Sequence, residues 1–173
     1  MAKKKRYYDK KKVLKAIGKY YRTTISKVIQ LVGSTNGVAL AGDSSGYTLN
    51  NLLGTTSTYQ ELGKQFALFK VRGVYIEVNP WFIGTGGGML CLALQQTNEE
   101  NNNGQVYSQP NVIPMSAQQI TRKYIKIGST WMPTNDSTVL SNLKLAYQVV
   151  QSFSTSMNFS ILIKLYLTFK ISI

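Results

Sequence analysis

The sequence predicts an all-β fold, a sandwich or a barrel, in a single domain of modest size. Apolar and polar residues alternate with a period of two along the longest apolar segments, as in strands that are buried on one face. The segments between them are rich in Gly, Asn, Ser, Thr and Pro, and no convincing helical periodicity is found in the body of the chain. We expect at least six strands.

The first strand is expected at residues 25–32, and a longer one follows at residues 66–79. In the longer segment Phe69 and Val71 share one phase of the alternation, whereas Val74 and the apolar residues after it share the other. The phase changes at Gly73. We expect a β-bulge or a bend there, because a glycine inside a strand often marks one.

Shorter strands are expected at residues 88–96, 120–127 and 143–151. Two long polar connections, residues 33–63 and 97–119, are expected to be loops, which in compact domains are usually functional or poorly ordered.

The last strand has the clearest pattern. Every odd-numbered residue from Met157 to Ile173 is apolar, and the even-numbered residues between them are mostly polar or amphipathic. One face of this strand is therefore expected to be buried, and the other to meet water or a polar partner.

Charge is concentrated at the N-terminus. Of a net charge of +13, residues 1–27 carry eleven basic residues against one acid, or +10, whereas residues 28–173 carry nine against six, or +3. This balance predicts a polyanionic partner. We divide the chain into a basic arm, residues 1–24, disordered in isolation, and a folded body, residues 25–173.

The arm is the strongest functional signal. Its cations can neutralise phosphates without sequence specificity and its tyrosines can stack on unpaired bases, so we expect it to bind single-stranded nucleic acid. The candidate binding residues in and beside the arm are Lys3, Lys4, Lys5, Arg6, Tyr7, Tyr8, Lys10, Lys11, Lys12, Lys15, Lys19, Tyr20, Tyr21, Arg22 and Lys27. The alternatives are a solubility tail, a nuclear-import signal and a segment that binds a membrane surface.

A second basic group lies in the body. Arg122, Tyr124 and Lys126 share one face of their expected strand, and Arg122 and Lys126 complete the set of candidate binding residues. A plain solvent-facing strand is the equal alternative. Trp81 and Trp131, each near a proline, are expected in the core or in an interface.

Catalysis is poorly supported, because the chain has no histidine and therefore no Ser–His or Cys–His pair. Gly84–Gly88 resembles a phosphate-binding loop, but no Lys-Ser or Lys-Thr follows it, so we expect a turn. Glu99, Glu100 and Asp136 lack the spaced oxygen ligands of a calcium loop. We expect no enzyme activity, no cofactor and no metal.

The single cysteine, Cys91, is expected to be a buried small hydrophobic residue, and it rules out an intramolecular disulfide. No apolar run approaches the roughly 20 residues of a membrane span, and no signal peptide is recognisable. We expect a soluble protein, intracellular when made and without membrane insertion.

Three segments resemble the capsid proteins of small circular single-stranded DNA viruses that encode a replication initiator, the circovirus-like group. They are the basic arm Lys3–Arg22, the strand Phe69–Pro80 with its alternating cations and aliphatic residues, and the closing strand Asn158–Lys170 with its Tyr and terminal Phe-Lys.

The resemblance implies an eight-stranded jelly roll, a T=1 icosahedral shell of sixty copies and an interior arm on the single-stranded DNA genome. It also implies a place in the virion, and nuclear import by host receptors before assembly. Two rivals remain, the coat protein of a satellite virus with an RNA genome and a monomeric nucleic-acid-binding β-domain. The monomeric rival predicts basic and aromatic residues spread over a face of the body.

Overall fold

The structure is a computed structural model of the chain. It describes residues 20–34, 37–40, 47–80, 88–96, 111–116, 118–128, 130–136, 143–151 and 157–171. Trp81, the expected turn at residues 84–87 and Glu99 with Glu100 lie outside these ranges.

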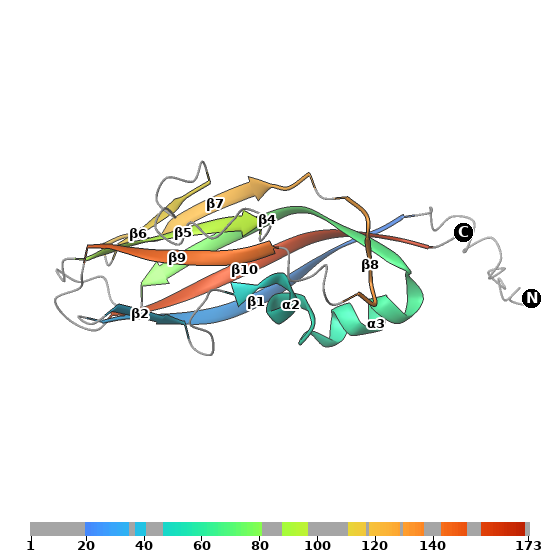
Figure 1. The fold of residues 1–173 in the computed structure, drawn as a ribbon, viewed down its shortest axis with the longest axis horizontal. Coiled ribbons are helices and arrows are strands. Elements are labelled where there is room, and N and C mark those ends of the chain that lie inside the picture. Colours follow the sequence, from blue (N-terminus) through green and yellow to red (C-terminus); the bar gives the residue numbers. More distant parts are fainter. Residues whose placement is uncertain are drawn as a thin grey trace, which may run out of the picture.

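Ten strands and two helices make up the described elements (Figure 1). The strands are β1 (Tyr20–Ser34), β2 (Gly37–Leu40), β3 (Tyr47–Thr48), β4 (Leu68–Pro80), β5 (Met89–Gln96), β6 (Ile113–Ser116), β7 (Thr121–Lys126), β8 (Met132–Pro133), β9 (Leu143–Gln151) and β10 (Met157–Lys170). The helices are α2 (Leu49–Leu53) and α3 (Ser57–Gln65).

The strands form two antiparallel sheets. A six-stranded sheet has the order β2-β1-β10-β4-β7, with β8 beside β4, and a four-stranded sheet has the order β3-β9-β5-β6. Strands far apart in the sequence are neighbours, since β1 pairs with β10 from Tyr20↔Lys170 to Gly33↔Met157. Eight strands in two facing four-stranded layers, β1-β10-β4-β7 and β3-β9-β5-β6, are the arrangement of a jelly roll.

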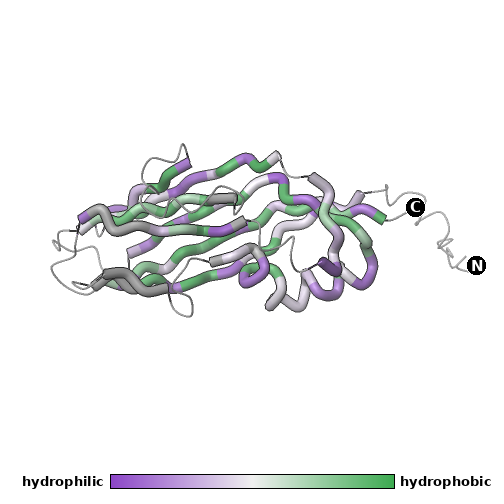
Figure 2. The backbone as a smooth tube through the Cα atoms, viewed as in Figure 1, coloured by the Kyte–Doolittle hydropathy of each residue, from purple (hydrophilic) through white to green (hydrophobic). Residues whose placement is uncertain are grey.

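One hydrophobic core lies between the two sheets. The burial of β10 alternates along the strand, with Phe159, Ile161 and Ile163 facing the core and the residues between them half-buried. Leu90 and Leu92 of β5 enter the same core from the other sheet. Green and purple accordingly alternate along the long strands in Figure 2. The period-two alternation of the sequence therefore predicted this core correctly.

The expected irregularity at Gly73 is a β-bulge. Tyr166 of β10 pairs with Gly73 and Leu167 pairs with Val71, so Arg72 is an extra residue in β4 with no partner in the ladder. The bulge reverses the phase, which is why Val71 and Val74 both face the core.

The expectation of a helix-free body was wrong. Residues 33–63, expected to be a loop, contain β2, β3, α2 and most of α3. In α2 the hydroxyl of Thr48 accepts a hydrogen bond from the N–H of Asn51, at 3.3 Å, as an N-cap. The α3 helix is polar and buries only Tyr59, so it has no apolar stripe long enough to announce a helix.

The strand β6 was also missed, because Pro114 interrupts its pattern. Proline is tolerated there since β6 is an edge strand of its sheet.

The α3 helix closes one end of the sandwich. Tyr59 packs edge-on against Phe69, with ring centroids 5.4 Å apart, and Phe66 packs against Phe169 at 5.6 Å. The hydroxyl of Thr134 donates to the carbonyl of Phe66 at 2.7 Å, which ties the β8 segment to the helix end. This aromatic cluster lies at the end of the molecule where β1 begins.

Cys91 is buried as expected. It packs with Ala93 and Ala146, and burial raises the pKa of its thiol. Among the described residues, no helix combines the length and the apolar character needed to cross a membrane.

Candidate nucleic-acid interface

The outer face of the six-stranded sheet gathers cations and aromatic rings. Side chains alternate between the two faces of a strand, so the residues between the core positions of β1, β10, β4 and β7 all point away from the core. We call this surface the basic face. Its cations and aromatic residues are Tyr20, Arg22, Lys70, Arg72, Tyr75, Arg122, Tyr124, Lys126, Lys164, Tyr166 and Lys170.

The strand register sets these cations side by side. Thr168 of β10 has Arg22 of β1 on one side and Lys70 of β4 on the other. Within the described part of this face there are seven cations and one carboxylate, Glu77, a balance of +6. Such a surface attracts polyanions.

Tyr20 fixes the place where the arm joins the body. Its ring stacks on Trp131 with centroids 5.7 Å apart and an interplanar angle of 18°. The amino groups of Lys70 and Lys170 lie 4.9 and 5.9 Å from the centroid of the same indole. Trp131 is half-buried, in contact with the basic face rather than inside the core.

Tyr21 lies on the other face of β1 and stacks on Phe66, with centroids 5.7 Å apart. Two of the four tyrosines that were predicted to stack on bases, Tyr20 and Tyr21, therefore stack on protein rings. The strand expected to start at residue 25 starts at Tyr20, so residues 20–24 of the expected disordered arm belong to the sheet. The candidate binding residues from Lys3 to Lys19 lie outside the described ranges.

Arg22 and Lys27 are separated by the sheet. Arg22 is exposed on the basic face, whereas Lys27 points to the opposite side and donates to the carbonyl of Asn51 at 2.8 Å and to the hydroxyl of Thr55 at 2.7 Å. The amino group of Lys27 thus holds the C-terminal end of α2 against β1, where a cation is favoured by the helix carbonyls.

Arg122 is neutralised within the protein. Its Nε donates to Glu77 at 2.8 Å, and the same carboxylate accepts from the hydroxyl of Tyr75 at 2.8 Å and from the side-chain amide of Asn79 at 3.0 Å. These hydrogen bonds, that of Arg122 first, lower the pKa of Glu77 to about 2. Lys126, in contrast, has no carboxylate partner among the described residues.

Tyr124 is the most exposed aromatic residue of the basic face, at 54 % exposure. Its ring meets that of Tyr166 edge-on, with centroids 5.7 Å apart. The prediction that Arg122, Tyr124 and Lys126 share one face is confirmed by the burial pattern of β7.

Sequence reasoning missed the other cations of this face, namely Lys70, Arg72, Lys164 and Lys170. Each lies on the polar phase of a strand that was predicted, or at its bulge. The recurrence of lysine on the polar phase could have indicated these cations. Only the strand register shows that β10, β4 and β7 are adjacent.

No protein-family model matches the sequence, and no curated protein matches it. Solved structures of viral proteins do match. The capsid protein of BFDV, a circovirus, solved as a decamer, has a TM-score of 0.56 at 9 % identity over 87 % of this chain and 99 % of that chain. The chain has the viral jelly-roll fold.

Two further matches extend the comparison. Cocksfoot mottle virus gives a TM-score of 0.64 at 8 % identity, over 89 % of this chain and 96 % of that chain. A T=1 subviral particle of a Penaeus vannamei nodavirus capsid protein deletion mutant gives 0.62 at 12 % identity, over 87 % and 97 %. At these identities the likeness is one of fold, and it spans almost the whole length of each viral chain.

Proposed function

We propose that this chain is a structural, non-enzymatic viral capsid protein, which self-assembles into a T=1 icosahedral shell of sixty copies and packages single-stranded DNA through its basic arm. One observation carries the proposal. The jelly roll of this chain has a basic face, and β1 begins at the end of that face, at Tyr20. The residues that precede Tyr20 in the sequence, 1–19, hold nine bases and one acid.

Electrostatics supports packaging. Residues 1–19 carry nine minus one, or +8, so sixty copies would bring about 480 charges to the interior, enough for roughly as many phosphates. The basic face would add to this if it lines the interior. Counterion release from the strand then drives condensation of the genome without sequence specificity.

The matching structures support self-association. Two of the matching structures are a decamer and a T=1 particle. Closure of a shell needs symmetric interfaces, roughly 2,000 Å² in total per subunit. In the described part of this chain the open sheet edges lie at β2, β7, β3 and β6, where further copies would pack.

The proposal of a circovirus-like virus is supported by the three resembling segments and by the match to the BFDV capsid protein. A satellite virus coat protein with an RNA genome is the alternative within the same class. The arm would also serve as the nuclear import signal, bound by import receptors through Lys3–Lys12, before the protein joins the virion.

A monomeric nucleic-acid-binding domain is a second candidate, and one observation favours it. The basic face spreads cations and an exposed tyrosine, Tyr124, over a sheet surface, as binding domains do. The two candidates differ in whether copies associate.

Sedimentation and electron microscopy of the purified protein test the proposal, on the full chain and on a chain without residues 2–19. The deletion stops before Tyr20, so that β1 stays complete. Both proteins are compared in about 0.15 M and 1 M salt, where screening separates the charge-driven step from closure of the shell.

Uniform particles of about 20 nm that lose their nucleic acid with the deletion are the expected result. Digestion of the released nucleic acid by DNase or by RNase then identifies the genome. A protein that stays monomeric in every condition, even with added single-stranded DNA, contradicts the capsid and favours the binding domain.

A further inference from the structure

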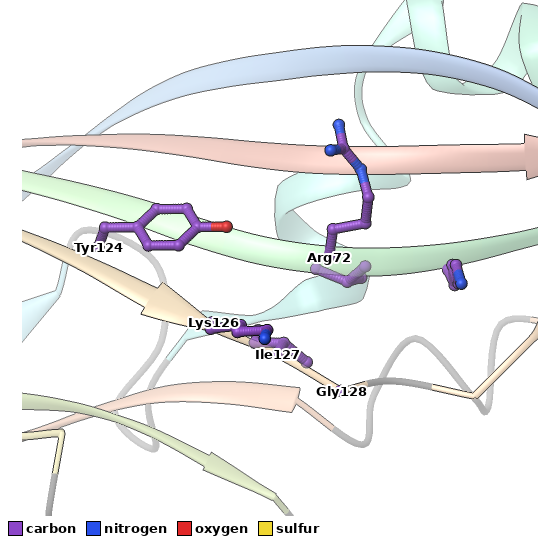
Figure 3. Close-up of a pocket in the computed structure, with 7 residues that line it drawn as sticks. Arg72, Tyr124, Lys126, Ile127 and Gly128 are labelled. Carbon is purple, nitrogen blue, oxygen red and sulfur yellow. The ribbon is translucent and has the colours of Figure 1, made fainter.

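We propose that a hollow beside the β-bulge of β4 binds a phosphodiester group of the single strand. The inference rests on the proposed function and adds a defined site to it. The hollow has a volume of about 350 Å³ and is lined by Lys70, Val71, Arg72, Tyr124, Lys126, Ile127 and Gly128 (Figure 3).

The bulge creates the hollow. Arg72 is the extra residue of β4, and its carbonyl accepts a hydrogen bond from the N–H of Ile127 at 3.0 Å, beyond the end of β7. Gly73 follows, and the ring of Tyr124 lies so close to it that a Cβ at this position would overlap the Tyr124 hydroxyl. The missing side chain of Gly73 thus lets Tyr124 form one wall.

The lining is cationic. Lys70, Arg72 and Lys126 contribute three positive charges, and no carboxylate is among the lining residues. In Figure 3 the guanidinium of Arg72 extends from β4 across β10, while Lys126 lies on the other side of β4. Arg72 and Lys126 lie on adjacent strands, because Lys126 pairs with Gly73, the residue after Arg72, and both residues line the hollow.

Nε of Arg72, a lining residue, is buried and has no hydrogen-bond partner among the described residues. The same holds for Oγ1 of Thr168, which pairs with Lys70 across the sheet but does not line the hollow. Buried donors without an acceptor are rare and costly. An acceptor-rich anion at the hollow would satisfy the guanidinium, whose planar fork fits phosphate oxygens.

The neighbouring ring specifies the kind of anion. Tyr124 is more than half exposed, so a base next to a bound phosphodiester can stack on it. Glu77 already neutralises Arg122 at the far end of β7, whereas the three cations of the hollow have no carboxylate partner among the described residues. A single strand thus has both a phosphate site and a stacking site within one stretch of the basic face.

The test uses the full chain and a fluorescein-labelled oligothymidylate of about 15 nucleotides. One variant combines Arg72→Gln with Lys126→Gln. The matched variant combines Lys164→Gln with Lys170→Gln, and so removes the same charge from the same face outside the hollow. Affinity is measured by fluorescence anisotropy over a range of salt concentrations.

We expect the hollow variant to bind about tenfold more weakly and the matched variant less than about threefold more weakly, in about 0.15 M salt. The slope of log affinity against log salt should fall by about 0.7 for each lost phosphate contact in the hollow variant. Equal losses in the two variants would overturn the site, because any two charges on the face would then act alike.

Thermal melting checks that both variants fold. If the double variant does not, Arg72→Lys decides, because it keeps the charge and removes Nε. A loss of twofold or more supports the site, and unchanged affinity overturns it.

Calorimetry with inorganic phosphate distinguishes the source of the ligand. Oligothymidylate binding that millimolar phosphate does not displace supports a strand site. The strand site is overturned in favour of a site for free anions if Arg72→Gln abolishes the heat of inorganic phosphate binding but leaves oligothymidylate binding unchanged. If the full chain forms particles that package nucleic acid, but the two variants lose oligothymidylate affinity equally, this site alone is overturned. If the full chain neither assembles nor binds oligothymidylate, the proposed function is overturned.

Discussion

The ring of Tyr20 stacks on the indole of Trp131, with centroids 5.7 Å apart and the two planes 18° from parallel. The stack joins the first described residue of β1 to the segment just before β8, and Lys70 and Lys170 lie over the same indole. The arm therefore leaves the body from a fixed point at the end of the basic face.

Trp131→Ala should lower the free energy of unfolding by about 1–2 kcal/mol, since it removes one aromatic pair and two half-buried cation–π contacts but little core. Urea unfolding measures the change. A double-mutant cycle with Tyr20→Ala isolates the stack and should give a coupling of about 0.5–1.5 kcal/mol. Additive effects would mean that the stack contributes nothing to the anchoring of β1.

Lys27→Met should destabilise the protein by about 1–3 kcal/mol, because the carbonyl of Asn51 and the hydroxyl of Thr55 lose their charged donor. Arg22→Gln, on the exposed side of the same strand, is the matched control and should change stability by less than about 0.5 kcal/mol. For oligothymidylate affinity the order should reverse, with the larger loss in Arg22→Gln. A larger loss of affinity in Lys27→Met would restore Lys27 as a binding residue.

Glu77 should make stability depend on acid pH. Its folded pKa of about 2 lies below its ordinary value of 4.5, so its contribution is complete above pH 4.5 and is lost as the pH falls from 4.5 through 2. Between pH 5 and pH 3 the wild type should therefore lose more stability than Glu77→Gln, as measured by urea unfolding. Glu61→Gln, on the exposed surface of α3, is the control for the change of net charge.

Glu77→Gln should also bind single strands more tightly. Without the carboxylate, Arg122 is free to contact phosphate, so affinity for oligothymidylate should rise about threefold and the salt slope by about 0.7. Glu61→Gln removes the same charge from another surface and should raise affinity by less than about 1.5-fold. Equal gains in the two variants would show that only the net charge matters.

Gly73→Ala should displace the ring of Tyr124, because the new Cβ would overlap its hydroxyl end. The ring is exposed and can move, so we expect a stability loss below about 1 kcal/mol together with weaker binding of oligothymidylate. Gly128→Ala is the control for stability, since a Cβ there meets no atom within 4 Å. A loss of several kcal/mol at Gly73 would instead indicate that the bulge itself cannot accept a side chain.

The alternation of apolar and polar residues predicted those features of the fold that neighbouring residues in one strand determine. The apolar alternation from Met157 onward and the phase change at Gly73 each correspond to a strand feature that adjacent residues determine. The α3 helix was missed because it contacts the core through little more than Tyr59, and the helical period needs a stripe of such residues.

The candidate site was predicted only where one strand carries it. Arg122 lies two residues before Tyr124 and Lys126 two residues after it, so the sequence alone predicts that they share a strand face. The proximity of Arg72 to Lys126, and the ion pair of Arg122 with Glu77, depend on the register between β4 and β7. The sequence of either strand alone does not contain that register.

The pairing of β1 with β10 also sets the order of events during synthesis. The arm and β1 leave the ribosome before the other described strands. The strand that β1 pairs with along almost its whole length is made last among the described strands, more than a hundred residues later. The six-stranded sheet cannot close before β10 has emerged, since β10 lies between β1 and β4. A nascent or prematurely terminated chain would thus carry the polycation without the complete sheet, and the proposed shell would grow only from finished subunits.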